Sequence, residues 1–489
     1  MKSGTRNVII VAACAVLLGG TAFALTRTGT GSSSSSSASS AAGIQLISKS
    51  SENVVSMKVT NKKGTYTLVP MKASASSSSA ASSSSVDYTV EELGGCPVDT
   101  SATSTVVQNG FSLSATKNVG TVSDLSQYGL TNPQATVEVK FKDGSTFSYK
   151  IGSATATDAS AYYMSGTDSK NVYVVSVDSG LLENANYFVK KEMLALSNSS
   201  GSTATGSSSS GVDFTQITLT GSNFPKNVVL QKSGEGLAII SPDSYAVDST
   251  NLSSLETCLT SLSAESVAAV NPDAAALKKY GLSNPTAAAE FTADKKNYKL
   301  IIGAKSGKDY YAMIDGVNVV YSVSADNVNG LVSQNLFTMR SKLVDIPSVA
   351  TVKSISVTSG STTNVINVTR TESTASSTQD KKAYNYKVTG NGGKALDYEN
   401  NYKRMYVKLI GISVYSDTDK KPSGTPAITI KYSYFDKAGA DTIELYQTDA
   451  RHYTILLNGK VYGLGVKSDI DSVMQFLTQF ENGQTIPQS

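Results

Sequence analysis

A stretch of seven residues that occurs twice decides the fold: QYGLTNP at residues 127–133 and KYGLSNP at residues 279–285. An isoleucine-glycine pair, two adjacent tyrosines and a Val-Tyr dipeptide follow each copy at matching places. They are Ile151-Gly152, Tyr162-Tyr163 and Val172-Tyr173 in the first copy, and Ile302-Gly303, Tyr310-Tyr311 and Val320-Tyr321 in the second. Because the spacings agree to within about four residues, the chain contains an internal repeat of supersecondary modules.

The repeated heptapeptide has the chemistry of a helix stop followed by a turn. Residues 274–279 are good helix formers, and Asn271-Pro272 before them predicts an N-cap with proline at the first helical position. Gly281 then supplies the left-handed residue that ends a helix. In the first copy, Ser123 is expected to cap a shorter helix that ends at Gly129. The motif is therefore interpreted as a structural element that ends a helix and turns the chain into a strand, and not as a functional site.

The segments after each heptapeptide alternate between apolar and polar residues, as half-buried strands do. Residues 137–141 alternate, Asp143-Gly144 predicts a hairpin turn, and residues 147–151 return. Residues 287–291 and 298–302 repeat this pattern, and Asp315-Gly316 predicts the tip of a second hairpin. Half-buried antiparallel sheet is the simplest interpretation.

A third, degenerate copy at residues 426–480 has strand-like alternation at 428–432 and 443–445 and a hairpin over Asn458-Gly459, but no Tyr-Gly-Leu or Ile-Gly pair. Each copy is expected to end in a helix, near residues 178–185, 326–337 and 469–480. Strand-like segments precede the copies at 54–69, 217–240, and 352–368 with 384–388. One module is thus a leading strand pair, a helical insertion, a four-strand meander and a closing helix, which predicts an α+β fold weighted to β.

Serine-rich tracts and these repeats divide the chain. We expect a membrane anchor or signal segment at 1–30, a serine-rich linker at 31–42, module 1 at 43–195, a serine-rich linker at 196–211, module 2 at 212–347 and degenerate module 3 at 348–483. Module 1 carries a serine-rich insertion at 73–85, and residues 371–381 are expected to form an exposed loop. The serine tracts bury little apolar area, which predicts flexibility.

The N-terminus has the pattern of a membrane span. Lys2 and Arg6 precede an uncharged run at residues 8–25, and Arg27 follows it. This order predicts a transmembrane helix with a cytoplasmic N-terminus and the bulk of the chain outside the cytoplasm. Two alternatives remain: secretion after cleavage near Ala24, where residues 22–24 read Ala-Phe-Ala, and lipidation at a short lipoprotein-like box ending at Cys14.

Composition excludes several function classes. The 42 Lys and Arg residues nearly balance the 39 Asp and Glu residues, so the chain has no strong positive field for nucleic acid. A single histidine excludes multi-histidine metal sites and most histidine-based triads. Among Cys14, Cys96 and Cys258, one disulfide outside the membrane segment is possible, between Cys96 and Cys258. Two buried free thiols are the alternative.

No nucleophile elbow, zinc motif or phosphate-binding loop occurs in the sequence. His452 has no identifiable orienting partner and is interpreted as structural or solvated. Asp417-Thr418-Asp419 resembles the start of a calcium loop, but Lys420, Lys421 and Pro422 follow, so a surface loop is expected. Recurring tyrosines could stack on sugars, yet their alternating strand positions favour the core. We therefore expect no catalytic, cofactor-binding or metal residues and no cofactor.

The order of leading strands, Tyr-Gly-Leu-x-Asn-Pro, Asp-Gly hairpin, Ile-Gly, paired tyrosines and Val-Tyr resembles the bacterial family called domain of unknown function 4340. The resemblance covers residues 120–190 and 244–345 well and residues 426–480 weakly. It implies a membrane-anchored extracytoplasmic protein of the kind encoded beside ABC-type transport systems linked to gliding motility, and it implies no catalytic residues. The chain departs from the family by its serine-rich insertions and by lacking tryptophan.

These observations lead to one expected function and two alternatives. The first is a non-catalytic, membrane-tethered scaffold or accessory component of a cell-envelope assembly, with an ABC-type transporter as its partner. The second is a binding module for cell-wall glycan or another envelope polymer. The third is a hydrolase whose carboxylates or Ser/Lys pair are brought together by the fold.

Overall fold

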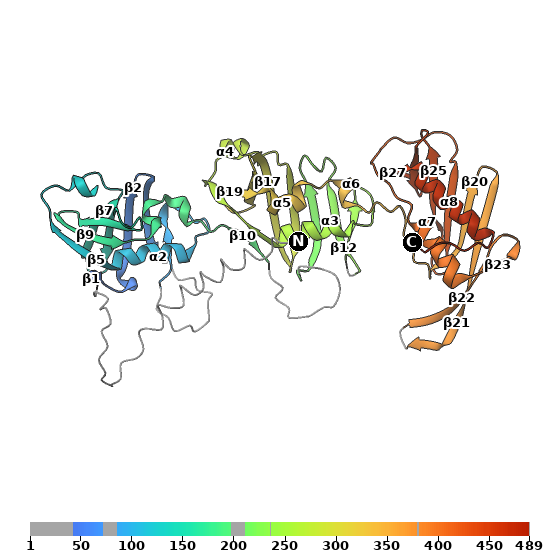
Figure 1. Ribbon diagram of the computed structural model, residues 1–489, viewed down its shortest axis with the longest axis horizontal. Helices are drawn as coiled ribbons and strands as arrows, with labels where there is room; N and C mark the ends of the chain where they lie inside the picture. Colours follow the sequence, from blue (N-terminus) through green and yellow to red (C-terminus); the bar gives the residue numbers. More distant parts are fainter. Residues whose placement is uncertain (1–42, 72–85, 197–210, 235, 379–380, 489) are drawn as a thin grey trace.

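The computed structural model describes residues 43–71, 86–196, 211–234, 236–378 and 381–488 (Figure 1). The expected membrane segment at 1–30, both of its alternatives, the serine-rich tracts at 31–42 and 73–85, and all but the two end residues of the linker at 196–211 lie outside these ranges. Among the helices within them, none is both long enough and apolar enough to cross a membrane.

Module 1 is built on a sheet that has nine strands in the described residues, all paired antiparallel. Their order is β1 (Ile44–Ser48), β5 (Ser112–Thr121), β9 (Asn171–Ser176), β8 (Ala161–Gly166), β7 (Thr146–Ala154), β6 (Ala135–Phe141), β2 (Val54–Asn61), β3 (Gly64–Pro70) and β4 (Tyr88–Val90). The predicted meander is β6 to β9, and the leading pair β2 and β3 extends it on one side.

Module 2 repeats this arrangement with eight strands in the described residues. Their order is β13 (Gly236–Ser241), β12 (Val228–Ser233), β11 (Phe214–Thr220), β16 (Ala287–Ala293), β17 (Lys296–Ser306), β18 (Asp309–Ile314), β19 (Val319–Ser324) and β15 (Ser266–Val270). The meander β16 to β19 again has the leading strands on one side. On the other side lies β15, at the place that β5 takes in module 1. The sequence did not predict these two strands.

Module 3 has a third sheet, whose eight described strands are β23 (Ala395–Leu396), β22 (Lys381–Thr389), β21 (Thr362–Thr378), β20 (Val352–Ser359), β24 (Ile428–Tyr434), β25 (Ala440–Gln447), β26 (His452–Leu457) and β27 (Lys460–Val466). The prediction of an exposed loop at residues 371–381 is wrong. Strand β21 continues to Thr378 and β22 begins at Lys381, with Thr371 opposite Asn385. Threonines in this segment favour extended backbone, and the two strands form an arm beyond the sheet (Figure 1).

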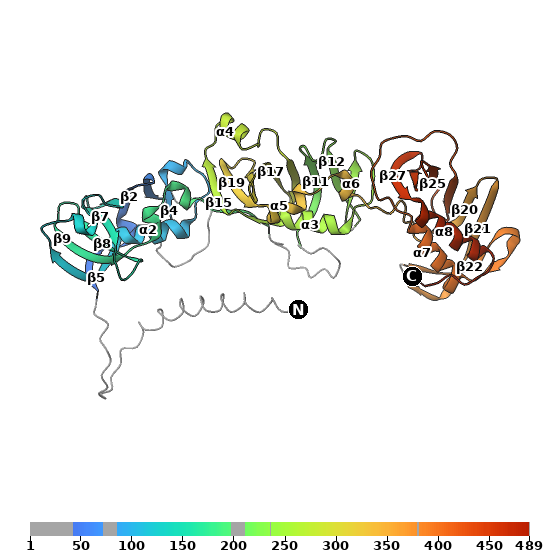
Figure 2. The same ribbon diagram turned by 45° about the horizontal axis from the view of Figure 1, so that its top comes forward.

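Helices lie against the sheets (Figure 2). Module 1 contains α2 (Thr100–Phe111) and the short helices η1 (Ser51–Asn53), η2 (Glu91–Leu93), η3 (Ser126–Tyr128), η4 (Ser179–Leu182) and η5 (Ala185–Phe188). Module 2 contains α3 (Ser249–Thr260), α4 (Ala274–Lys279), α5 (Ala325–Val332) and α6 (Leu336–Met339). Module 3 contains η6 (Asn391–Gly393), η7 (Tyr398–Tyr402), α7 (Lys403–Ile410) and α8 (Lys467–Glu481).

Some predicted helix boundaries need correction. Asp273 caps α4 by accepting the Ala276 amide at 2.7 Å, whereas the predicted cap Asn271 has a left-handed φ of 48°. The predicted cap Ser123 does not cap η3: the residue before this helix is Leu125, without a side-chain cap, and Asp124 accepts the Ser126 amide at 2.8 Å. The closing helix expected at 178–185 is two short 3-10 turns, η4 and η5, each begun by an Asp or Asn side chain. The short polar side chains at these starts stabilise tight turns without a longer helix.

The two glycine motifs of each repeat, Tyr-Gly-Leu and Ile-Gly, contact each other. Gly281 is left-handed at φ 72° and ends α4 as predicted. The carbonyl oxygen of the preceding Tyr280 accepts the Ala304 amide at 2.8 Å, and a Cβ on Gly303 would overlap that oxygen. In module 1, a Cβ on Gly152 would overlap the Tyr128 carbonyl oxygen in the same way. The Tyr-Gly-Leu stop therefore packs directly on the Ile-Gly strand end.

The recurring tyrosines also meet across the module. Tyr128 packs edge-on against Tyr163 with ring centroids 4.9 Å apart, and Tyr280 packs against Tyr311 at 4.6 Å. Both pairs are half-buried. The tyrosines of the repeat motifs thus contact one another, but these four are half-buried and do not belong to the buried core for which they were predicted.

Cys96 and Cys258 are both free and buried, so the possible disulfide is not formed. Burial raises the pKa of the Cys258 thiol to about 12 and also raises the pKa of Cys96. A raised thiol pKa leaves little thiolate, which is the reactive form. These two cysteines therefore behave as small apolar core residues.

Candidate functional site

A groove with a volume of about 810 Å³ lies where module 2 meets module 3. Its lining comes from the loop between β11 and β12, from the start of α6 and from the segment that follows α7. The lining residues are Asn223, Phe224, Pro225, Lys226, Asn335, Leu336, Phe337, Tyr415, Ser416, Asp417, Thr418 and Asp419. Ligand sites are commonly of this size and commonly lie between domains. Neither module forms the groove alone.

The β11–β12 loop is held against the sheet of module 2 by its backbone. Gly221 has a φ of 107° and lies so close to the Pro285 and Thr286 carbonyls that a side chain would not fit. The Asn223 side chain then donates to the Val332 carbonyl oxygen at 2.6 Å, and Phe224 is buried. This loop is a fixed wall of the groove.

Helix α6 forms the second wall and has a capping box at its start. The Asn335 side chain accepts the Thr338 amide at 2.9 Å, and the Thr338 hydroxyl accepts the Asn335 amide at 2.8 Å. At the other end, the Lys342 ammonium donates to the carbonyl oxygens of Phe337, Thr338 and Arg340. Both ends of this one-turn helix are therefore satisfied, which fixes Leu336 and Phe337 beside the groove.

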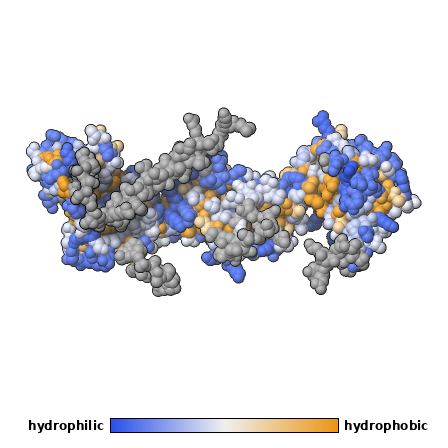
Figure 3. Space-filling view, turned by 60° about the horizontal axis from the view of Figure 1, so that its bottom comes forward, coloured by the Kyte–Doolittle hydropathy of each residue, from blue (hydrophilic) through white to orange (hydrophobic). Residues whose placement is uncertain are grey.

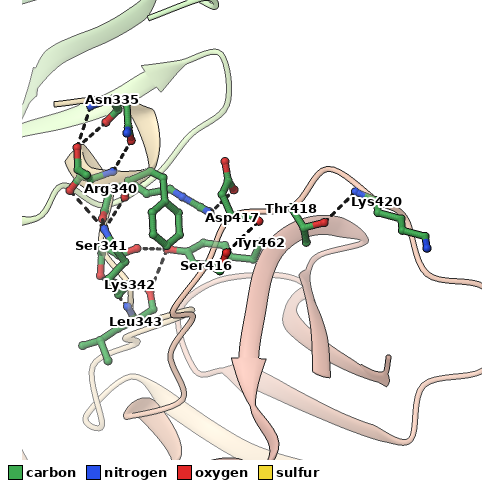
Figure 4. Close-up of polar contacts among 12 residues, drawn as sticks. Asn335, Arg340, Ser341, Lys342, Leu343, Ser416, Asp417, Thr418, Lys420 and Tyr462 are labelled. Atoms are coloured by element: carbon green, nitrogen blue, oxygen red, sulfur yellow. Dashed lines mark hydrogen bonds and ion pairs between the residues drawn. The ribbon is translucent and has the colours of Figure 1, made fainter. Parts of the chain in front are cut away.

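Arg340 lies beneath the groove and is 2 % exposed. Its guanidinium is surrounded by the rings of Tyr245, Phe337 and Tyr462, at 4.9, 5.1 and 4.6 Å from their centroids. Its Nη2 donates to Asp417 Oδ1 at 2.9 Å (Figure 4). Its Nη1 has no hydrogen-bond partner among the described residues. A buried cation needs its counter-charge, so Arg340 fixes Asp417 at the edge of the groove.

Tyr462 joins the two modules beside this cation. The single proton of its hydroxyl is shared between the backbone carbonyls of Ser341 and Leu343, whose oxygens lie 2.9 and 3.0 Å away (Figure 4). Its ring packs edge-on against Tyr245 of module 2, with centroids 5.6 Å apart. Burial raises the pKa of the Tyr462 phenol to about 12. The hydroxyl therefore stays protonated and keeps donating at physiological pH.

Tyr415 is the most exposed aromatic residue of the groove, at 51 %. Its amide donates to the Leu464 carbonyl at 2.9 Å, and the Leu464 amide donates back to the Ser416 carbonyl at 2.9 Å. The Tyr415 ring stacks on the imidazole of His452, with centroids 5.2 Å apart and 29° between the planes. Backbone and ring are thus both held in place although half of the side chain faces solvent.

His452 has an orienting partner that the sequence did not identify. Its Nδ1 lies 2.9 Å from Asp449 Oδ2, and this hydrogen bond holds the pKa of the Asp449 carboxyl below its usual range. The histidine supports Tyr415 from behind, which is consistent with the structural interpretation of this residue.

The Asp417-Thr418-Asp419 segment is at the surface, as predicted, but it is not simply solvated. Asp417 pairs with Arg340 and both aspartates line the groove, while the Thr418 hydroxyl accepts the Lys420 amide at 3.2 Å. In the described part of the chain, no group of three or more His, Cys, Asp or Glu residues is placed to hold a metal ion.

Smaller cavities lie elsewhere in the described residues, and two of them are large enough to note. One of about 310 Å³ in module 3 is lined by Asp345, Tyr434 and Asp441, among others. Burial, and then the nearby Asp441 charge, raise the pKa of Asp345 to about 6. The other, of about 500 Å³, lies in module 2 between α3 and α5 and is lined mostly by hydroxyl and amide groups beside Cys258. On the face shown in Figure 3, apolar surface is broken into separate patches by hydrophilic residues.

The family model described as Domain of unknown function (DUF4340) matches residues 81–223 and 238–424. These two matches cover more than half of the chain. The chain belongs to this family. The resemblance seen in the repeat motifs is thereby confirmed, with two copies. None of the curated proteins and none of the solved structures matches the chain.

The bounds of the two family matches do not coincide with the bounds of the sheets. The first begins before β4 of module 1 and ends after β11 of module 2, and the second begins within β13 and ends beyond α7 of module 3. Each match therefore spans a boundary between modules, and the second spans the boundary between modules 2 and 3, where the groove lies. The sequence predicted neither the groove nor Arg340, because its lining comes from three segments up to about two hundred positions apart. Asp417-Thr418-Asp419, which the sequence singled out as a surface loop, was the one part of the lining that it named.

Proposed function

We propose that the protein is a non-catalytic scaffold, tethered to the outer face of a membrane by its N-terminus, that serves as an accessory component of a cell-envelope assembly. An ABC-type transporter is the partner that the family resemblance suggests. The observation that carries this proposal is that the modules are joined by buried, specific contacts. A scaffold needs such joints, because domains linked only by flexible chain move independently.

The first joint is held by backbone pairing as well as by side chains. At the end of module 1, β10 (Glu192–Ala195) pairs antiparallel with β14 (Ser261–Ser263) of module 2. The Tyr321 hydroxyl donates to the Lys190 carbonyl at 3.2 Å, and Cys96 Sγ lies 3.5 Å from the Asn318 carbonyl. The buried apolar residues of modules 1 and 2 form one continuous cluster. Such a joint supports a fixed angle between the two sheets.

The second joint uses the Arg340 cluster. Its buried guanidinium, the Tyr245–Tyr462 ring contact and the two hydrogen bonds of the Tyr462 hydroxyl link module 2 to module 3. Lys460 and Asp243 add a surface ion pair of 2.6 Å across the same boundary. With both joints in place the three modules lie in a row (Figure 1). A row of this kind suits a protein that holds a partner at a set distance from its anchor.

In-cell crosslinking tests the scaffold role. Full-length protein with a C-terminal tag is treated with a mild crosslinker in intact cells and purified in detergent, and its partners are identified by mass spectrometry. Integral membrane proteins are expected among the captured partners, and a version lacking residues 1–30 is the control for capture in the membrane. Recovery of the full-length chain without partners would argue against the proposal. Resistance of the tag to external protease in spheroplasts would contradict the extracytoplasmic location.

A further inference from the structure

We propose that the groove between modules 2 and 3 binds a neutral saccharide chain, with the Tyr415 ring as its stacking platform and Asp417 and Asp419 as hydroxyl acceptors. The proposal goes beyond the scaffold role. Either can fail without the other, because saccharide binding requires neither the membrane segment nor a protein partner.

The first argument is the state of the Tyr415 ring. An aromatic side chain that is 51 % exposed is usually free to change rotamer, but this one is held on one face by His452 and at its backbone by Leu464. Tyr415 lines the groove, and about half of its side chain remains accessible there. A pre-positioned aromatic face loses little entropy when a flat apolar surface stacks on it. The C–H face of a pyranose ring is such a surface.

The second argument is the placement of acceptors around the ring. Asp417 is two positions from Tyr415, and Ser416 between them is paired with Leu464. Tyr415 and Asp417 both line the groove, so an aromatic ring and a carboxylate are available to one ligand there. Arg340 fixes one oxygen of Asp417, at 2.9 Å. The carboxylate, whose side chain is 59 % exposed, can then accept sugar hydroxyls with little further ordering.

The third argument is charge, which favours a neutral ligand. The carboxylates of Asp417 and Asp419 are balanced by the buried guanidinium of Arg340 and by Lys226 on the opposite wall. A nucleic acid or another polyanion needs a surplus of cations, and this groove has none. Amides from Asn223 and Asn335 and apolar surface from Leu336 and Phe337 complete the lining. Mixed polar and apolar surface without net charge suits a polyhydroxylated ring compound.

A peptide is the main competing occupant, and the backbone disfavours it. Extended peptides usually bind by adding a strand to an open sheet edge. Strand β27 is the edge strand of the third sheet on this side, but Ser416 already pairs with Leu464 there. The Leu464 carbonyl accepts the Tyr415 amide and the Leu464 amide donates to the Ser416 carbonyl, so both backbone groups of Leu464 are already used at this edge.

The test measures binding by the full-length protein, with isothermal titration of N-acetylglucosamine tetramer and maltotetraose and with sedimentation on purified peptidoglycan. We expect saturable binding of at least one saccharide. Tyr415→Ala should weaken it by about tenfold or more, whereas Tyr415→Phe keeps the ring and should stay within about threefold. Tyr187→Ala is the matched control, because Tyr187 is also an exposed aromatic (39 %) that contacts a neighbouring ring, in module 1.

The outcomes are distinct. Pelleting with peptidoglycan together with tetramer binding identifies wall glycan as the source, and soluble binding without pelleting identifies a free oligosaccharide. Absence of saturable binding to all three probes overturns the proposal. So does an equal affinity of Tyr415→Ala and Tyr187→Ala, provided that thermal melts show both variants folded. Binding of an uncharged ten-residue peptide in place of the saccharides would reassign the groove to a peptide partner.

Discussion

At the scale of single residues, the glycine of each Ile-Gly pair has a role that spacing alone did not explain. Gly303 has no room for a side chain, because the Tyr280 carbonyl oxygen occupies the place of a Cβ. The same contact recurs at Gly152 in module 1. The Tyr-Gly-Leu and Ile-Gly motifs recur together because the carbonyl oxygen of the tyrosine packs where the second glycine has no side chain.

This contact predicts a specific loss of stability. Gly303→Ala should destabilise the protein by about 1–3 kcal/mol, since either the strand or the helix stop must shift to relieve the overlap. Gly236→Ala is the control in the same module, because a Cβ there meets nothing within 4 Å and its φ is not left-handed. Urea unfolding measures both variants. Equal stability of the two variants would contradict the interlocking of the motifs.

Asp345 predicts a dependence of stability on pH. Its pKa is raised to about 6, mainly by burial, and one of its oxygens has no partner among the described residues. A carboxyl whose folded pKa exceeds its unfolded value of about 4 costs stability as pH rises from about 4 through 6. Asp345→Asn should therefore stabilise the protein by about 1–2 kcal/mol at pH 7 and have little effect at pH 4.

Denaturant unfolding at both pH values measures the Asp345 effect. Asp168→Asn, in an exposed turn of module 1, controls for the loss of one negative charge. A gain from Asp345→Asn that is the same at pH 4 and pH 7 would show that the ionisation of this carboxyl is not the cause.

At the scale of elements, the strand pair β10 and β14 is the part of the first joint most open to test. Leu194 is 4 % exposed and lies opposite Leu262, which is 1 % exposed. Leu194→Ala should cost about 2–4 kcal/mol because it leaves a cavity in this joint. It should also speed the reaction of Cys96, whose thiol contacts module 2.

Thiol labelling in a Cys14→Ser, Cys258→Ser background, in which Cys96 is the remaining thiol, measures this opening. Val55→Ala is the control, because Val55 is 46 % exposed in module 1. If Cys96 reacts equally fast in both variants, the pairing of β10 with β14 does not hold the joint closed.

The elements differ in how far the sequence determines them. Strands β6, β7, β16 and β17 were predictable because their apolar residues alternate and Asp-Gly or similar turns separate them. Strand β5 was not, because Ser112–Thr121 is mostly polar and exposed, and it is extended only because it pairs with β1 and β9. The groove was not predictable either, because Phe224, Asn335 and Tyr415 meet only after two modules have packed together.

At the scale of the whole molecule, stiffness is the property that the joints predict. Spin labels on cysteines introduced at Lys278 in module 2 and Lys387 in module 3, with the native cysteines replaced, should give a single narrow distance distribution. Arg340→Ala should broaden it, because the variant leaves Asp417 unpaired and empties the space between three aromatic rings. Electron-electron double resonance measures this distribution.

Circular dichroism of the Arg340→Ala variant separates a loosened joint from loss of fold. A broad distribution in the unsubstituted, doubly labelled protein would contradict a rigid row of modules, whatever the variant shows.

The offset between the family matches and the sheets has a consequence for how such a chain can change in length. Each match runs across a boundary between modules. One family unit therefore contains residues of the joint to the next module as well as most of a sheet. Duplication of one unit would then supply a ready-made attachment for the added piece. Gain or loss of one whole unit would therefore change the length of the row of modules while keeping every contact between neighbouring modules.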